Sequence, residues 1–242
     1  MNISQNIDSQ TGISPLGGGK TSLNSPLVDY ALNGLQRCWM PEYDRWSHIY
    51  HLDGRSQPNE SVAHSDVFYT LNVLLGFSRV KEIPETIDLS RIFERNVIQL
   101  TKLPVRKYAY GMALWAAAEL KLDIPSDVVR HIESLLSDSS SWWNFRAQDL
   151  GMLLIGAVMQ AKAGQKQWLR FVHALFRFLV EKYLSRSGLF FDAPSGFRRR
   201  FASFQAKPTC YRCDEFTGDL GASEIARACT RNLIKLQGSP GE

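Results

Sequence analysis

The densest group of polar and aromatic side chains falls in residues 48–66. The stretch sets carboxylates, imidazoles and aromatic rings close together, and Glu60, His64 and Asp66 are its candidate acid–base groups. Carboxylic acids of this kind protonate a leaving oxygen or activate water, and nearby rings can stack on a sugar. The stretch therefore predicts sugar chemistry or, in the plainer interpretation, a hydrogen-bonded surface loop in which Asp66 caps a helix.

Other motifs do not predict a metal or a cofactor. The histidines lack the HxxxH or HExxH spacing of a helical zinc site. Cys210 and Cys213 have CxxC spacing, but no second ligand pair accompanies them, so we interpret them as incidental thiols. Residues 17–21 end like a phosphate-binding loop, yet Ser14 stands where the first glycine is required and no strand precedes it.

Composition and charge narrow the function classes. Apolar residues make up 44% of the chain and charged residues 21%, which is ordinary globular composition. The net charge of +4 is mild, and residues 198–200 are the only dense basic group, so we predict no nucleic-acid partner. Because no apolar run is long enough for a bilayer and no signal-peptide pattern is present, we expect a cytoplasmic protein without a membrane partner.

Apolar residues recur at helical spacing along most of the chain. Residues 1–25 are a polar tail, expected to be disordered, and 26–242 form one domain. Residues 40–65 are predicted to be a long loop that could contain a short hairpin. The predicted helices cover about 26–39, 65–75, 89–100, 108–120, 125–136, 148–163, 168–184 and 222–237. Pro104 and Pro125 mark boundaries between them, and Ile225, Cys229 and Ile234 of the last helix are predicted to face the core.

Strongly apolar helices alternate with amphipathic ones at a period of about forty residues, which is typical of an array of helical hairpins. Such an array can be an open solenoid or a ring in which outer helices surround inner ones. The strongly apolar segments, such as residues 108–120, favour the ring, because its inner helices are shielded by the outer layer.

With this alternation, the turn at residues 188–192 and the Gln237–Gly238 ending, the chain resembles the α/α-toroid superfamily of six-hairpin glycosidases, sugar epimerases and terpenoid cyclases. The resemblance covers residues 26–242. It implies an all-α fold of helical hairpin repeats that form an incomplete (α/α)6 toroid. The chain departs from the pattern where Pro208 interrupts an expected inner helix. With only about four hairpins counted, the toroid is expected to be truncated, and its exposed inner helices predict self-association.

In toroids the ligand cup lies at one end of the inner helices. Asp66, Tyr108 and Asp149 begin such helices, so the resemblance implies that they lie on one rim, and it adds Asp149 to the catalytic candidates. The tryptophan pair at 142–143 could equally anchor a packed loop. The candidate substrate-binding residues are Tyr69, Tyr110, Trp142, Trp143, Arg146 and Asp192.

These observations predict a carbohydrate-active or carbohydrate-binding protein with a saccharide ligand and a place in polysaccharide metabolism. The alternative is a non-catalytic helical-repeat scaffold or a truncated, inactive remnant. A terpenoid-cyclase function would require an acidic motif that the sequence lacks. The sequence leaves open whether the chain is an enzyme.

Overall fold

The protein is mostly helical, as predicted. The computed structural model describes residues 26–49, 63–80, 83, 87–186, 188–202 and 221–236. This part of the chain contains eight α-helices, four short 3-10 helices and one two-stranded sheet. The α-helices are α1 (Pro26–Cys38), α2 (Ala63–Phe77), α3 (Leu89–Val97), α4 (Tyr108–Leu120), α5 (Ser126–Ser137), α6 (Ala147–Lys162), α7 (Leu169–Tyr183) and α9 (Ala222–Leu236).

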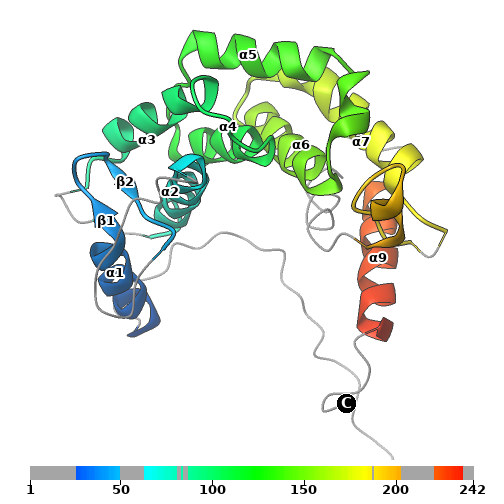
Figure 1. The fold of residues 1–242 in the computed structure, drawn as a ribbon, viewed down its shortest axis with the longest axis horizontal. Coiled ribbons are helices and arrows are strands. Elements are labelled where there is room, and N and C mark those ends of the chain that lie inside the picture. Colours follow the sequence, from blue (N-terminus) through cyan, green and yellow to red (C-terminus); the bar gives the residue numbers. More distant parts are fainter. Residues whose placement is uncertain are drawn as a thin grey trace, which may run out of the picture.

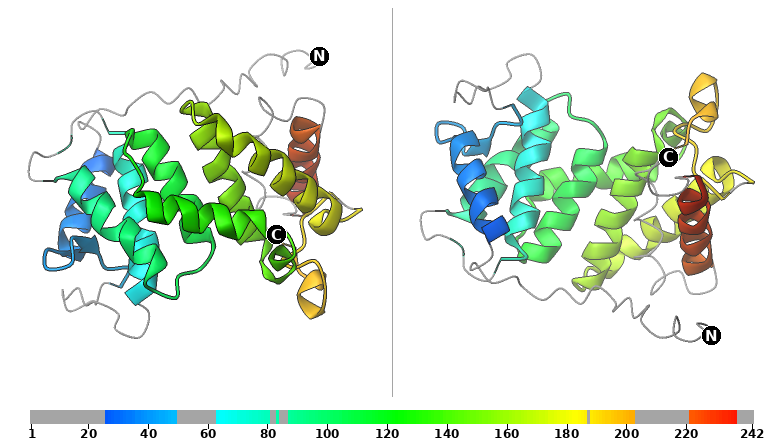
Figure 2. Two further views of the ribbon diagram at one scale, coloured as in Figure 1. Left: turned by 90° about the horizontal axis from the view of Figure 1, so that it is seen from above. Right: turned by 90° about the horizontal axis from the view of Figure 1, so that it is seen from below.

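Consecutive helices alternate between two layers of an arc (Figure 1). Helices α2, α4 and α6 form the inner layer, and α3, α5 and α7 form the outer layer. From below, the three inner helices lie side by side, with α1 at one end of the row and α9 at the other (Figure 2). The arc follows the predicted alternation of strongly apolar and amphipathic segments.

The inner helices are apolar on nearly every side because they are covered on several sides. In α4 the successive residues Met112, Ala113 and Leu114 are all buried, although they point in different directions around the helix. The outer helix α5 instead buries one face, through Val128, Ile132 and Leu136. Helix α4 has the predicted bounds, so the sequence pattern gave both its position and its burial correctly.

The two inner helices α4 and α6 approach through glycines. A Cβ atom added to Gly111 would lie 2.1 Å from the Met152 carbonyl oxygen, and one added to Gly156 would lie 2.5 Å from the Gly111 carbonyl oxygen. One turn further on, the side-chain amide of Gln160 donates to the Leu114 carbonyl at 2.7 Å. Small side chains thus let the two backbones come close enough to be joined by a buried hydrogen bond.

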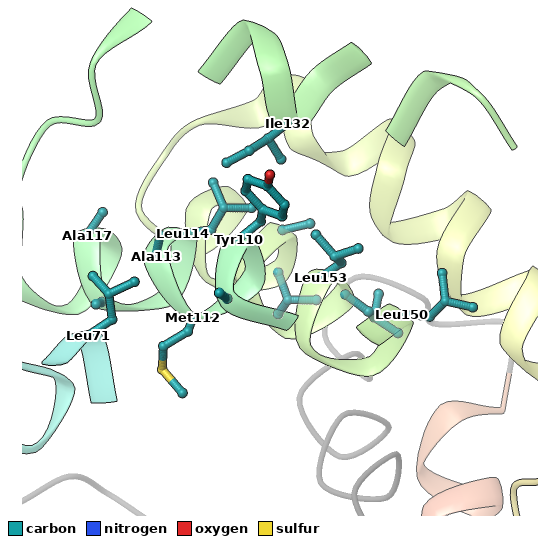
Figure 3. Packing of buried hydrophobic residues seen from close by; sticks show 14 of the residues in the cluster. Leu71, Tyr110, Met112, Ala113, Leu114, Ala117, Ile132, Leu150 and Leu153 are labelled. Carbon is teal, nitrogen blue, oxygen red and sulfur yellow. The ribbon is translucent and has the colours of Figure 1, made fainter. Parts of the chain in front are cut away.

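The core extends from this contact into the outer layer (Figure 3). Tyr110 points from α4 toward Ile132 of α5, whereas Met112 points away from the outer layer. The Tyr110 hydroxyl donates to the Leu100 carbonyl at 2.9 Å and lies 3.1 Å from His131 Nε2. Tyr110 therefore connects the two layers.

A short hairpin follows α1, at the start of the loop that was predicted for residues 40–65. Strands β1 (Trp39–Met40) and β2 (Arg45–Trp46) pair antiparallel. The turn between them places Asp44 at φ 47°, and this buried carboxylate accepts hydrogen bonds from Arg91 and Arg95 of α3. The hairpin is thus joined to the outer layer by charge-assisted hydrogen bonds.

Helix α9 contacts the core at only part of its predicted apolar face. Cys229 is buried and Ile225 packs against the core, as predicted. Ile234 was also predicted to face the core, but it is 62% exposed, so that prediction was wrong. Helical spacing identifies an apolar face, but it does not tell whether a neighbouring element covers the whole length of that face.

Candidate functional site

The first turns of the three inner helices lie together at one end of the inner layer. The backbone N–H of Tyr108, at the start of α4, donates to Asp149 Oδ1 of α6 at 3.1 Å. The rings of Phe68 in α2 and Tyr108 meet edge to face with centroids 4.5 Å apart. We call this end, from Asp66 through Tyr108 to Asp149, the N-terminal rim.

Asp66 is the most deeply buried acidic group of the rim, with 1% of its surface exposed. Its Oδ1 accepts the backbone N–H of His48 at 3.0 Å and lies 2.5 Å from His48 Nδ1. The carboxylate therefore holds the segment after β2 against the first turn of α2. Asp66 and His48, grouped together in the sequence analysis, do meet in the structure.

His48 in turn supports an exposed tyrosine. The imidazole and the Tyr69 ring are parallel within 1°, with centroids 5.1 Å apart. Tyr69 is 44% exposed. One face of the predicted substrate-binding residue Tyr69 is thus packed on a ring that Asp66 holds in place.

Asp149 connects two inner helices. Besides the Tyr108 N–H, it accepts the backbone N–H of Arg146 at 3.0 Å through Oδ2, as a capping-box residue at the start of α6. Both carboxylate oxygens of Asp149 therefore have backbone partners. The candidate catalytic residue carries a structural role at this position.

The rim is electrostatically mixed around Tyr108. Burial raises the pKa of the Tyr108 hydroxyl, and the neighbouring Tyr69 and Asp149 raise it further. Arg106 and Arg146 act in the opposite direction on the same pKa. The predicted residues Tyr69, Arg146 and Asp149 thus lie close enough to influence one hydroxyl.

Asp192 extends the rim beyond α6. Its backbone carbonyl accepts the N–H of Ala147, the first residue of α6, at 3.0 Å. Its side chain accepts a hydrogen bond from Arg198 at 3.2 Å. Asp192 and Asp149 both raise the pKa of the buried Tyr183 hydroxyl, after the larger effect of burial. The structure therefore places the predicted Asp192 beside the start of α6.

The tryptophan pair has two different environments. Trp142 is buried, and its indole N–H donates to the Leu135 carbonyl at 3.4 Å. Trp143 is exposed and packs edge to face on Phe178 of α7, with Lys182 over its ring. Trp142 is thus placed as a loop anchor, and Trp143 lies on the surface of an outer-layer helix.

The remaining predicted residues are Tyr110, His64 and Glu60. Tyr110 is buried and points to the outer layer, away from the inner side of the arc (Figure 3). His64 lies in the first turn of α2. Glu60 lies outside the described residues, as do Cys210, Cys213 and Pro208.

Beside the rim, a cleft of about 1000 Å³ separates α1 from α2. His48, Tyr69 and Asn72 line one side of this α1–α2 cleft. The α1 side includes Asn33 and Arg37. No residue of α1 was predicted from the sequence to bind a ligand. The polar residues on the helix face opposite Leu32 and Leu35 could have indicated this side of the cleft.

The two predicted acids accept hydrogen bonds from the backbone. Asp66 on α2 and Asp149 on α6 lie on either side of α4. Asp66 accepts the N–H of His48, and Asp149 accepts those of Tyr108 and Arg146. Both carboxylates therefore have a structural role in the described part of the chain.

Among the described residues, no group of three or more histidine, cysteine or acidic side chains is arranged to hold a metal ion. The same part of the chain has no helix long and apolar enough to cross a membrane.

No protein-family model, curated protein or solved structure matches this chain. The resemblance to α/α toroids therefore stays a prediction.

Proposed function

We propose that this chain is a carbohydrate-binding protein of the α/α-toroid type, and that its saccharide lies in the α1–α2 cleft against Tyr69. The observation that carries the proposal is the Asp66–His48–Tyr69 arrangement. A buried carboxylate fixes an imidazole, and the imidazole supports an exposed aromatic ring at the cleft. A ring held in advance loses little conformational freedom when a ligand stacks on it.

The rest of the cleft suits a polyhydroxylated ligand. Its lining includes the amides of Asn33, Gln36 and Asn72, which can both donate hydrogen bonds to hydroxyl groups and accept them. Tyr30 adds a second exposed ring from α1. Aromatic faces combined with neutral two-way hydrogen-bonding groups match the two kinds of surface that a sugar ring presents.

The proposal is binding without hydrolysis, because the two acidic candidates already have backbone partners. Asp66 and Asp149 accept backbone N–H groups, and α4 lies between them. In this proposal both residues position the site. Tyr69, with the amides of the cleft, contacts the ligand.

A thermal-shift screen with mono- and oligosaccharides tests the proposal. Because a ligand that binds the native state stabilises it, at least one saccharide should raise the melting temperature of the wild-type chain. Tyr69→Ala should bind that saccharide about 3- to 10-fold more weakly, since one stacking surface is lost. The matched control is Tyr43→Ala, because Tyr43 is also about half exposed but does not line the cleft.

Cys38 provides a second readout, because it lines the cleft. Burial raises the pKa of its thiol, so alkylation should be slow at neutral pH and is best followed at mildly alkaline pH. The saccharide should slow the alkylation of Cys38, measured by peptide mass spectrometry. If the saccharide left this rate unchanged, the ligand would lie elsewhere.

The second candidate function is a non-catalytic helical scaffold. It is favoured by the same backbone contacts of Asp66 and Asp149, because a scaffold needs its inner helices tied together and needs no ligand. A cooperative melt that no saccharide shifts, in wild type and in Tyr69→Ala alike, would favour the scaffold and contradict the first proposal.

A further inference from the structure

A second cavity adjoins the α1–α2 cleft, and Leu35, Gln36 and Trp46 line both. It has a volume of about 320 Å³ and is lined mainly by large apolar side chains. These come from α1, the hairpin, the end of α2 and the start of α3. The apolar lining comprises Leu32, Leu35, Trp39, Trp46, Phe77 and Ile92, with Ile87 at the edge.

One cation lines this apolar cavity. Arg91 contributes to its wall, and Gln36 supplies an amide. The guanidinium of Arg91 donates one hydrogen bond, at 3.0 Å, to Asp44. Since a guanidinium carries five N–H groups, further donors of Arg91 can serve a ligand.

The charge of the cavity lining itself is positive. Among its described residues Arg91 carries a charge, and no acidic side chain lines the cavity. Behind the wall, Arg91 and Arg95 both pair with the buried carboxylate of Asp44. A cation on an otherwise apolar wall favours an anion there.

The volume limits what can enter. Protein cores rarely leave voids larger than a water molecule, and an apolar cavity of about 150 Å³ accommodates benzene. A cavity of about 320 Å³ is roughly twice that size. It therefore fits two fused rings or a short acyl chain, and it is near the lower end of the range for small-molecule sites.

We infer that this cavity binds a small apolar carboxylate, whose ring or acyl body packs against the cluster of Trp39, Trp46 and Phe77 and whose anionic group pairs with Arg91. The inference does not depend on the proposed saccharide site. The two cavities share part of their walls, but Arg91 and Phe77 line only this one, and Tyr69 lines only the α1–α2 cleft.

Two probes of equal shape test the inference: 2-naphthoate and its neutral analogue 2-naphthalenemethanol. Isothermal titration calorimetry on the full chain should show that wild type binds naphthoate at least tenfold more tightly than the alcohol. Arg91→Gln should weaken naphthoate binding about tenfold or more, as expected for a charge-assisted hydrogen bond, and should leave the alcohol unchanged.

Arg95→Gln is the matched control. Both arginines pair with Asp44 and have similar exposure, 59% for the Arg91 side chain and 54% for Arg95, but only Arg91 lines the cavity. Arg95→Gln should change naphthoate affinity less than threefold. An equal loss in both variants, or equal binding of the two probes by wild type, would overturn the inference.

Filling the cavity gives an independent check. Leu32→Trp adds a ring from α1, and Leu32 does not line the saccharide cleft. This variant should lose naphthoate binding and keep a cooperative melt, and saccharide binding should persist. Wild type that binds neither naphthalene probe would also overturn the inference, whatever the saccharide screen shows.

Discussion

Gly111 and Gly156 face each other where α4 and α6 come closest. A side chain at Gly111 would overlap the Met152 carbonyl. Gly111→Ala should therefore lower the free energy of unfolding by about 1–3 kcal/mol or more, because two helix backbones must separate to accept the methyl group. Urea denaturation measures this change. Gly76→Ala, in α2 with open space around it, is the control and should be neutral or stabilise by up to about 1 kcal/mol.

Asp149 should be more important for stability than for any activity. Asp149→Ala removes two charge-assisted hydrogen bonds, to Tyr108 and Arg146, and should cost about 2–4 kcal/mol. The exposed Asp127, in the first turn of α5, is the control, and Asp127→Ala should cost less than about 1 kcal/mol. A stable Asp149→Asn variant that lost a catalytic activity would instead indicate an acid–base role.

Tyr183 should make the protein sensitive to alkali. Its hydroxyl donates to the Phe145 carbonyl at 2.7 Å, and burial, with the carboxylates of Asp149 and Asp192, raises its pKa. The unfolded chain releases this proton near pH 10 while the native state keeps it. The unfolded state then binds fewer protons, so stability falls as pH rises above about 10.

Tyr183→Phe tests that dependence. The variant should lose about 1–2 kcal/mol at neutral pH, because the Phe145 carbonyl loses its donor, and its stability should decline less steeply above pH 10. Urea melts from pH 8 to 11 measure both effects. Tyr108 and Tyr110 also have raised pKa values, so part of the slope should remain. A slope equal to that of wild type would show that Tyr183 does not contribute.

Asp66 should control the position of His48 and, through it, the Tyr69 ring. Asp66→Asn should weaken saccharide binding while the cooperative melt is kept, because the amide can still accept the His48 backbone N–H but cannot hold the imidazole with a charge. Binding titrations measure the affinity. Asp88→Asn, a helix cap that lies outside the cleft, is the control and should leave saccharide affinity unchanged.

Helix positions were largely predictable from the sequence. The apolar spacing and the prolines at 104 and 125 placed α4 and α5 close to their observed bounds, because these signals act within one helix and its two ends. The same signals predicted that α4 is buried on several sides. Truncation and self-association were predicted from the resemblance and stay predictions.

The site was less predictable, because it depends on which helix ends meet. The sequence listed Tyr110 and Trp142 with Tyr69, but tertiary packing buries the first two and leaves Tyr69 at the cleft. The resemblance implied one rim for Asp66, Tyr108 and Asp149, but it did not predict that Asp149 accepts the Tyr108 N–H.

The sequence by itself determined a mostly helical chain of alternating apolar and amphipathic segments, since helical periodicity is a local property. The tertiary structure decided which polar groups form hydrogen bonds between helices and which face a cavity. These arrangements join side chains that are far apart in the chain. Arg91 and Trp46 line one cavity, and His48 stacks on Tyr69, because the packed helices bring them together.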